Sequence, residues 1–245
     1  MIRSILFDLD GTLVQTETLK AESYALAAQE LCPYTIIKED VLQAYQSMLG
    51  SPRDRVAQDL VRRFDLQDVA EKRMQELGVR TPWQAFIQIR LRYYERLVGD
   101  PEVIRQNKCP HALGLLDWGL ARGYRIGVAT MSHCPQASRI LDLLAPELSL
   151  DILITRDDVD RGKPDPEIYL SAARQLDMSP QECLVIEDSA TGIRAALAAG
   201  MTCLAVPSSF TAPEVERSGL LPQANLAASP EMLQQTAEQL LDQGS

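Results

Sequence analysis

Two aspartates near the N-terminus have the spacing and the setting of a reactive site. Asp8 and Asp10 directly follow the apolar residues 5–7, and Gly11 comes next. A short run of β-forming residues that ends in acids predicts a buried strand whose last residues emerge at an edge of a sheet. In open α/β sheets the ligand site lies outside the carboxyl ends of the strands. An Asp-Gly turn would explain Asp10 but not Asp8, which continues the apolar run.

A second pair of acids follows another apolar run further along the chain. Glu187 and Asp188 come directly after residues 184–186. Two adjacent acids at the end of a buried strand are costly when they pack together without a cation. The alternative is local, because Asp188 or Ser189 could instead cap the helix that follows.

Two hydroxyl residues and one lysine complete the set of reactive side chains. Thr130 and Ser132 follow a predicted strand at residues 125–129, and their hydroxyls could donate hydrogen bonds to an oxyanion. Lys163 stands between a glycine and a proline, the two residues with the strongest influence on backbone conformation. Taken singly, a threonine at a strand end is commonly just a β-former, and a lysine in a loop is commonly exposed.

Taken together, these residues indicate one metal-assisted site. Four carboxylates, two hydroxyls and one lysine would converge at the carboxyl edge of one sheet. Oxygen ligands without histidine suit Mg²⁺. A carboxylate and a phosphate dianion about 4 Å apart repel by several kcal/mol at an effective dielectric of about 20. Mg²⁺ and Lys163 could offset that repulsion and let an aspartate attack phosphorus, so the sequence predicts Mg²⁺-dependent phosphoryl transfer.

The elements that must position these residues alternate between strands and helices. Strands are expected near residues 1–15, 125–129, 152–154, 184–186 and 203–206, and helices at 112–122, 133–144, 166–176, 191–199 and from 229 onward. Strands that alternate with helices predict right-handed βαβ units and a parallel sheet. The predicted fold class is therefore α/β.

Residues 16–100 have a different character, with almost no strand signal. The pairs Ser51-Pro52 and Thr81-Pro82 each predict a helix start, with a cap followed by proline at the first helical position. Apolar residues then recur at three- and four-residue steps, which is typical of an amphipathic helix. The segment is too long for a loop inside a compact domain. We therefore expect two domains: a core of residues 1–15 and 101–245, and an all-helical insert of residues 16–100.

Composition and charge exclude several classes of protein. The formal net charge of −10 and the pI of about 4.8 argue against a nucleic-acid partner, because phosphate binding needs a basic face. Five scattered cysteines without a CxxC pair argue against a disulfide framework or a zinc site. No apolar stretch is long enough to span a membrane, and Asp8 and Asp10 interrupt any signal peptide. We expect a cytoplasmic protein with no membrane partner.

The motifs resemble, in order, those of the haloacid dehalogenase (HAD) superfamily. The matching segments are Asp8-Leu9-Asp10-Gly11-Thr12-Leu13, Thr130, Gly162-Lys163-Pro164-Asp165-Pro166 and Ile186-Glu187-Asp188-Ser189. The segment from Ser189 to Gly200 is also similar to the β-phosphoglucomutase and phosphatase branch of subfamily IA. The resemblance implies a Rossmann-like, three-layer α/β/α core with a parallel sheet. It also implies that residues 16–100 form a C1-type helical cap.

The resemblance implies a role for each catalytic residue. Asp8 would be the nucleophile that takes the phosphoryl group. Asp10 would protonate the leaving oxygen and then activate water. Thr130 would bind the phosphoryl oxygens, and Lys163 would neutralise the nucleophile and the phosphate.

The resemblance likewise implies a Mg²⁺ site at the same strand ends. Asp8, Asp188 and the backbone carbonyl of Asp10 would hold the ion. Glu187 would be either a further ligand or a hydrogen-bond acceptor behind the ligands.

The candidate substrate-binding residues are Lys20, Arg53, Arg90 and Ser132. Arg53 falls where relatives use an arginine to hold a distal phosphate, and Arg90 is a further candidate because guanidinium favours bidentate contacts with phosphate. Either arginine could instead be an ordinary solvated side chain. Related sugar-phosphate mutases carry a histidine about where Lys20 stands, and this difference counts against a mutase without excluding it.

Our interpretation of the sequence is a Mg²⁺-dependent phosphatase that acts on a small phosphorylated metabolite, such as a sugar phosphate or bisphosphate, through an aspartyl-phosphate. Dehalogenases of the superfamily lack the aspartate at the position of Asp10, so the resemblance argues against dehalogenation. A β-phosphoglucomutase-like mutase and a non-catalytic phosphate-binding regulator stay open as alternatives. The intramolecular cap makes a monomer the expected state.

Overall fold

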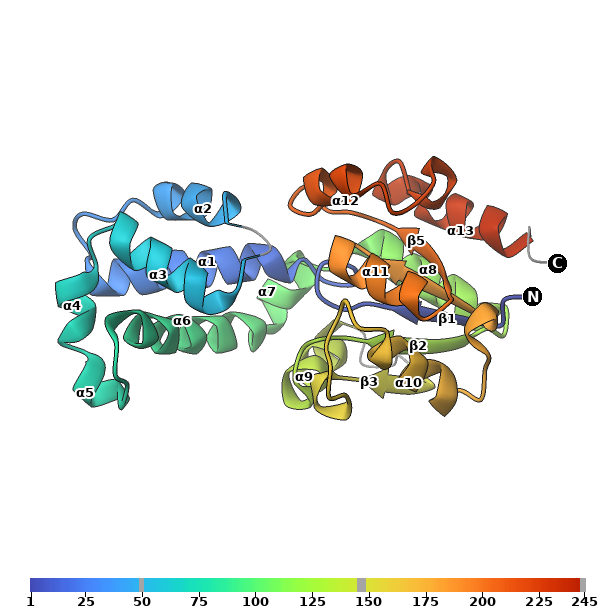
Figure 1. Ribbon diagram of the computed structural model, residues 1–245, viewed down its shortest axis with the longest axis horizontal. Helices are drawn as coiled ribbons and strands as arrows, with labels where there is room; N and C mark the ends of the chain where they lie inside the picture. Colours follow the sequence, from blue (N-terminus) through green and yellow to red (C-terminus); the bar gives the residue numbers. More distant parts are fainter. Residues whose placement is uncertain (49–50, 145–148, 243–245) are drawn as a thin grey trace. The chain divides into compact units, whose positions relative to one another are not determined.

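The computed structural model describes residues 1–48, 51–144 and 149–242 (Figure 1). Residues 49–50, 145–148 and 243–245 fall within the expected domains but lie outside the described residues. The chain divides into two compact units, a core unit of Met1–Gln15 with Ile104–Ser245 and a helical unit of Thr16–Val103. The second junction between the units lies within the helix α7 (Pro101–Gln106), slightly beyond residue 100.

A parallel sheet of five strands forms the centre of the core unit. The strands are β1 (Ser4–Phe7), β2 (Arg125–Ala129), β3 (Ile152–Ile154), β4 (Cys183–Glu187) and β5 (Thr202–Ala205), in the order β3-β2-β1-β4-β5. Every neighbouring pair is parallel, so the predicted α/β class with a parallel sheet is confirmed. The chain builds outward from β1 on one side and then crosses to β4 on the other, which makes the carboxyl end of β1 a topological switch point.

The register of the sheet places the reactive strand ends side by side. Phe7 is in register with Val128 on one neighbour and with Ile186 on the other. The residues that follow these three therefore emerge together at one edge. Asp8 remains tied to that edge because its backbone N–H donates to the carbonyl of Ile186 at 3.0 Å.

Helices cover both faces of the sheet, so the three-layer arrangement is confirmed (Figure 1). The core-unit helices are α8 (Pro110–Ala121), α9 (Cys134–Leu144), α10 (Glu167–Gln175), α11 (Ala190–Ala198), α12 (Ala212–Ser218) and α13 (Leu233–Asp242), with short 3-10 turns at Arg156–Asp158, Pro180–Glu182, Gln223–Asn225 and Pro230–Met232. α8 packs on β2 and α13 packs on α8, while α10 packs on β2 and β3, and its neighbour α11 packs on β4 and β5. Coverage on both faces explains why the strands are mostly apolar runs rather than alternating apolar and polar residues.

The helical unit is built around two long helices. Its helices are α1 (Thr16–Leu31), α2 (Lys38–Gln46), α3 (Arg53–Arg63), α4 (Gln67–Glu71), α5 (Met74–Leu77) and α6 (Pro82–Val98). α1 packs along α6, and the shorter helices pack around this pair. Alanines of α1 are fully buried and allow the close approach that brings Tyr24 and Phe86 together in the core of the unit.

Two helix starts differ from expectation. Pro52 precedes α3 instead of forming its first residue, because its ψ of 145° is extended while its carbonyl already accepts the first helical bond from Val56. The last helix begins as a 3-10 turn at Pro230, and the α-helix itself starts at Leu233. The start at Thr81-Pro82 is confirmed, since α6 begins at Pro82. Of the helices in the described part of the chain, none is both long enough and apolar enough to cross a bilayer.

Candidate active site

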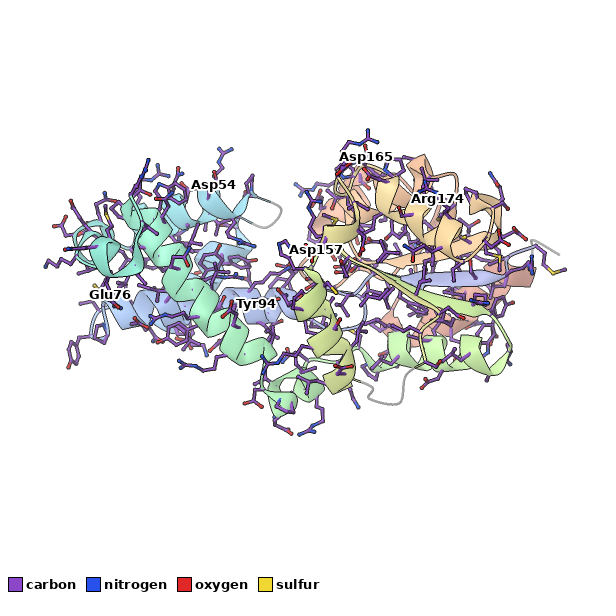
Figure 2. The ribbon with its side chains drawn as sticks, turned by 90° about the horizontal axis from the view of Figure 1, so that it is seen from below. Asp54, Glu76, Tyr94, Asp157, Asp165 and Arg174 are labelled. Carbon is purple, nitrogen blue, oxygen red and sulfur yellow. The ribbon has the colours of Figure 1, made fainter. Side chains whose placement is uncertain are left out.

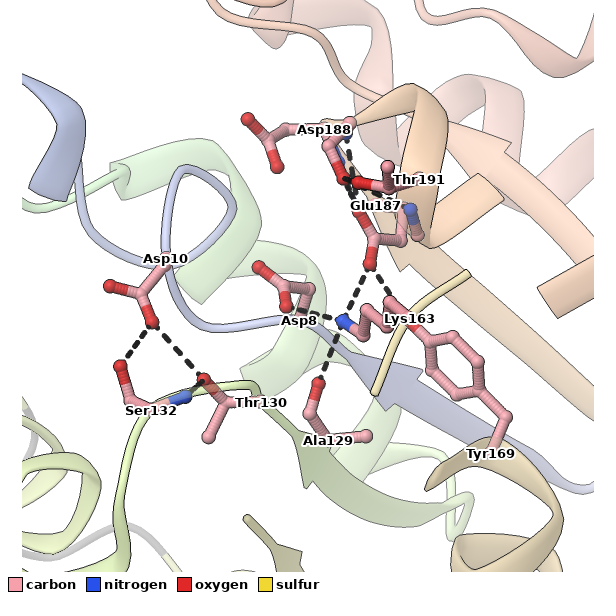
Figure 3. Close-up of polar contacts among 12 residues, drawn as sticks. Asp8, Asp10, Ala129, Thr130, Ser132, Lys163, Tyr169, Glu187, Asp188 and Thr191 are labelled. Atoms are coloured by element: carbon pink, nitrogen blue, oxygen red, sulfur yellow. Dashed lines mark hydrogen bonds and ion pairs between the residues drawn. The ribbon is translucent and has the colours of Figure 1, made fainter. Parts of the chain in front are cut away.

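The carboxyl edge of the sheet brings seven of the predicted site residues together (Figure 3). They come from the loops after β1 and β2, from the last residue of β4 and the residue after it, and from the loop before α10: Asp8, Asp10, Thr130, Ser132, Glu187, Asp188 and Lys163. The four segments are far apart in sequence but adjacent in the sheet, which is why the site needs the complete core unit.

The ammonium of Lys163 lies at the centre of the site. Its Nζ is 2.6 Å from Oδ1 of Asp8, 2.6 Å from Oε1 of Glu187 and 3.1 Å from the carbonyl oxygen of Ala129. An ammonium has three N–H donors, so these three acceptors satisfy it completely. The side chain is only 6% exposed, and the two short contacts are therefore charge-assisted bonds in a medium that screens them weakly.

The carboxylate of Glu187 is fully buried and accepts hydrogen bonds at both oxygens. Oε1 accepts from Lys163 and from the phenol of Tyr169 at 2.8 Å. Oε2 accepts from the backbone N–H groups of Asp188 and Ser189 and from the Ser189 hydroxyl, at 3.0 to 3.2 Å. The Ser189 hydroxyl also accepts a hydrogen bond from the Gly192 N–H. Ser189 therefore caps α11, which is the local role that the sequence analysis considered for it. Five donors fix this carboxylate in one orientation.

Asp8 is a carboxylate held in an unfavourable electrostatic setting. Burial, together with the carboxylates of Glu187 and Asp10, raises the pKa of Asp8 to about 7, although the interaction with Lys163 lowers it. Burial lowers the pKa of Lys163, but Asp8 and Glu187 more than offset this and hold the pKa above its ordinary value. One ammonium therefore does not neutralise this group of acids, and a further cation would favour the ionised form of Asp8.

Asp10 occupies a different environment only two residues away. Its Oδ2 accepts from the hydroxyl of Ser132 at 2.6 Å and from the hydroxyl of Thr130 at 3.1 Å. The backbone N–H of Ser132 in turn donates to the Thr130 hydroxyl at 3.0 Å, which orients it. Figure 3 shows Asp10 on the Thr130 and Ser132 side of the site, apart from the contacts that Lys163 makes with Asp8.

Three buried carboxylates could hold a metal ion. Oxygens of Asp8, Glu187 and Asp188 all lie within 4.8 Å of one another. Gly11 leaves room for this arrangement, because a Cβ at that position would lie 2.3 Å from Oδ2 of Asp188, and its φ of +95° disfavours any other residue. A set of hard oxygen donors without histidine or thiolate fits Mg²⁺. The carboxylate of Asp10 is not part of this cluster of described residues.

The other three candidates lie in the helical unit. Nζ of Lys20 pairs with Oε1 of Glu17 at 2.5 Å. Arg53 is exposed at the first turn of α3. Arg90 is only 4% exposed, which excludes the solvated alternative for this residue.

Arg90 is a buried cation for which the described residues provide no paired carboxylate. Its guanidinium carbon lies 4.9 Å from the ring centre of Tyr24 and 4.5 Å from that of Tyr94, which is labelled on α6 in Figure 2. Its Nε has no hydrogen-bond partner among the residues that the structure describes. Burial lowers the pKa of Arg90, and the charge of Arg53 lowers it further.

Sequence reasoning missed two contributors to the core site. Tyr169 occupies an apolar position of α10, so the helical pattern made it look like an ordinary core residue. The carbonyl of Ala129 is a backbone acceptor, which side-chain patterns do not reveal. Ser189 was considered only as a helix cap, and it also donates to Glu187.

Comparisons with known proteins agree with this arrangement. A family model described as haloacid dehalogenase-like hydrolase matches residues 2–200. Validoxylamine A 7'-phosphate phosphatase of Streptomyces hygroscopicus subsp. limoneus is 30% identical over 222 residues, which cover 90% of this chain and 93% of that protein. The phosphorylated carbohydrates phosphatase of Thermotoga maritima is 28% identical over 82% of each chain.

A solved structure supports the fold over the whole chain. The crystal structure of β-phosphoglucomutase from Clostridium difficile has a TM-score of 0.64 and 21% sequence identity, and the match covers 99% of this chain and 100% of that one. Since the family model spans most of the sequence and includes every reactive residue of the core site, the chain belongs to the haloacid dehalogenase-like hydrolase family.

Proposed function

We propose that this protein is a Mg²⁺-dependent phosphatase that hydrolyses a small phosphorylated metabolite of the sugar-phosphate class. The proposal rests on the different environments of two aspartates in one loop. Asp8 lies against an ammonium and among other carboxylates, whereas Asp10 is held by two hydroxyls. Two carboxyl groups in contrasting environments are suited to separate roles as nucleophile and as acid and base.

The first half of the reaction transfers the phosphoryl group to Asp8. A carboxylate oxygen of Asp8 attacks phosphorus, the bond from phosphorus to the leaving oxygen breaks, and Asp10 supplies the proton which that oxygen needs. Thr130 and Ser132 keep the Asp10 carboxyl in place for this step. In the second half, Asp10 takes a proton from a water molecule that attacks the aspartyl-phosphate, and inorganic phosphate leaves.

Positive charge is needed throughout, because two anions must approach each other. Lys163 contributes one charge directly beside Asp8. Mg²⁺, held by Asp8, Asp188 and the backbone carbonyl of Asp10, with Glu187 as ligand or acceptor, would add Lewis-acid stabilisation of the phosphoryl oxygens. The raised pKa of Asp8 supports the need for such a cation at neutral pH.

We further propose that the helical unit is a cap that selects the substrate. The names of the two phosphatases above point to phosphorylated carbohydrates and related compounds. Arg90, whose buried charge is not paired with a carboxylate of the described residues, and Arg53, as a second positive charge, favour a substrate that carries another anionic group besides the transferred phosphate. All five cysteines are free, which supports our proposal that the protein is cytoplasmic. We also propose that it is a monomer.

A sugar-phosphate mutase is the second candidate, because a β-phosphoglucomutase shares this fold along its entire length. A mutase would keep the aspartyl-phosphate from water until a sugar hydroxyl accepts it. Conversion of β-glucose 1-phosphate to glucose 6-phosphate, primed by the bisphosphate and without release of free phosphate, would favour the mutase over the phosphatase.

The proposal is tested by phosphate release from an aryl phosphate and from a panel of phosphorylated metabolites, each with Mg²⁺ and with a chelator. We expect Mg²⁺-dependent hydrolysis by the wild-type protein and a loss of at least about 10³-fold in the Asp8→Asn variant. Activity that persists in Asp8→Asn would remove Asp8 as the nucleophile. A wild-type protein that binds phosphorylated metabolites but hydrolyses none of them would favour the non-catalytic regulator.

A further inference from the structure

We propose that Tyr169 is a positioning residue for phosphoryl transfer, which acts through Glu187 to hold Lys163 against the nucleophile Asp8. This inference rests on the proposed function and extends it to a residue outside the reactive motifs. Tyr169 lies on α10 and is completely buried. A buried phenol that only filled the core would be expected to contact apolar groups and a nearby backbone oxygen.

Tyr169 packs in the apolar core of the unit, but its polar contacts are with the two charged groups next to Asp8, Glu187 and Lys163. Its hydroxyl donates to Oε1 of Glu187 at 2.8 Å, and the face of its ring lies 5.0 Å from Nζ of Lys163 (Figure 3). Burial and the nearby carboxylates of Glu187 and Asp8 raise the pKa of Tyr169 far above its ordinary value, so the phenol stays a donor at every relevant pH.

The orientation of Lys163 depends on the orientation of Glu187. Oε1 of Glu187 lies 2.6 Å from Nζ, and this contact leaves the other two N–H groups for Asp8 and for the carbonyl of Ala129. Without the phenol, Oε1 would keep only the Lys163 bond, and the carboxylate could rotate toward the backbone donors on Oε2. The ammonium would then follow it away from Asp8.

Gly192 leaves room for the same carboxylate. A Cβ at this position would lie 1.7 Å from Oε1 of Glu187, so any side chain there must displace the carboxylate. The position of Oε1 of Glu187 therefore depends on both residues. Tyr169 holds it by a hydrogen bond, and Gly192 leaves the space that it occupies. Their substitutions should have the same effect on catalysis.

The experiment compares Tyr169→Phe, Gly192→Ala and the double variant by aryl phosphate hydrolysis and thermal unfolding. Tyr169→Phe keeps the ring over Lys163 and removes only the hydroxyl. We expect kcat to fall about tenfold in each single variant, with KM changed less than about twofold, because a small displacement of a reacting group slows the chemical step. The double variant should lose far less than the product of the two effects, because both act on Glu187.

Tyr93→Phe is the matched control, since Tyr93 also interacts with a glutamate, Glu30, whose pKa it helps to lower, but in the helical unit. It should keep the wild-type kcat. Wild-type kcat in Tyr169→Phe, or losses in the double variant that simply multiply, would overturn the inference. If Tyr169→Phe does not fold, a wild-type kcat in Gly192→Ala would overturn it equally.

The outcomes separate this inference from the proposed function. If the wild type hydrolyses the aryl phosphate, Asp8→Asn does not and Tyr169→Phe matches the wild type, only the role of Tyr169 is wrong. If the wild type shows no Mg²⁺-dependent hydrolysis, the proposed function fails and the positioning role fails with it.

Discussion

Two buried cations, Lys163 in the core unit and Arg90 in the helical unit, are held in opposite ways. Lys163 contacts two carboxylates at 2.6 Å and a backbone carbonyl. Arg90 is equally inaccessible, but its guanidinium lies between the rings of Tyr24 and Tyr94 and its Nε has no hydrogen-bond partner within the described residues. The carboxylates of Asp8 and Glu187 keep the pKa of Lys163 above its ordinary value, whereas burial lowers the pKa of Arg90.

The difference shows what each unit lacks. In the core unit the acids outnumber the lysine, because three carboxylates cluster around a single ammonium that pairs with two of them, Asp8 and Glu187. That imbalance favours the binding of a further cation. In the helical unit no described carboxylate pairs with the buried arginine Arg90, and the exposed Arg53 adds to the same positive charge. That imbalance favours the binding of an anion. A metal ion for the core and an anionic substrate for the helical unit would satisfy both.

The largest effect is expected when the core cation is removed. Lys163→Met should lower kcat about 10³-fold and reduce the free energy of unfolding by roughly 3–5 kcal/mol, because it leaves buried carboxylates without their partner. Steady-state kinetics and urea unfolding measure the two effects. Arg161→Met is the control from the same loop, where the side chain is 72% exposed and its ion pairs should contribute less than about 1 kcal/mol. Equal effects in the two variants would contradict the special role of Lys163.

An intermediate effect is expected when the negative charge of the core is reduced. Asp188→Asn should raise the Mg²⁺ concentration for half-maximal activity about 10- to 100-fold, because it removes one carboxylate from the cluster. Titration of activity with Mg²⁺ gives this value directly. Asp142→Asn, an exposed position on α9, should leave it unchanged. An unchanged Mg²⁺ requirement in Asp188→Asn would separate this acid from the metal.

The smallest effect is expected in the helical unit. Arg90→Met should raise KM about tenfold for a substrate with a second anionic group, yet leave the KM for a plain aryl phosphate unchanged. The free energy of unfolding should change by less than about 1 kcal/mol, because relief of burial of the charge offsets the lost contacts with the two rings. Arg96→Met is the control, since Arg96 lies over Tyr93 on the same helix but is exposed. A large loss of stability with no change in either KM would make Arg90 a structural residue.

The sheet and the convergence of the core residues could be predicted because they follow from local patterns. β2 and β3 lie at the predicted residues, since each is a short apolar run bounded by polar or turn-forming residues. Parallel strands bring their carboxyl ends together, so Asp8 and Glu187 could be expected to meet without knowledge of the order of the strands. The short helices α4 and α5 were not predicted, because segments of this length depend on tertiary packing rather than on sequence periodicity.

The roles of buried polar groups were harder to predict. Arg90 lies four residues after Phe86 and four before Tyr94, on the buried face of α6, and that spacing, not its residue type, is the signal that it is buried. For Tyr169 the position was misleading. An apolar position on α10 is typical of a core residue, and it does not indicate that the hydroxyl donates to Glu187. Which oxygen of Glu187 receives which donor depends on the packing of three separate segments, and no sequence pattern contains that information.

The most direct test of the central claim is the mass of the protein after rapid acid quenching during turnover of an aryl phosphate with Mg²⁺. We predict a fraction of the wild-type chain that is heavier by one phosphoryl group, with the group on the peptide that contains Asp8, and no such fraction in Asp8→Asn. Rapid phosphate release with no phosphorylated protein, or a phosphoryl group on another residue, would contradict the assignment of Asp8 as the nucleophile.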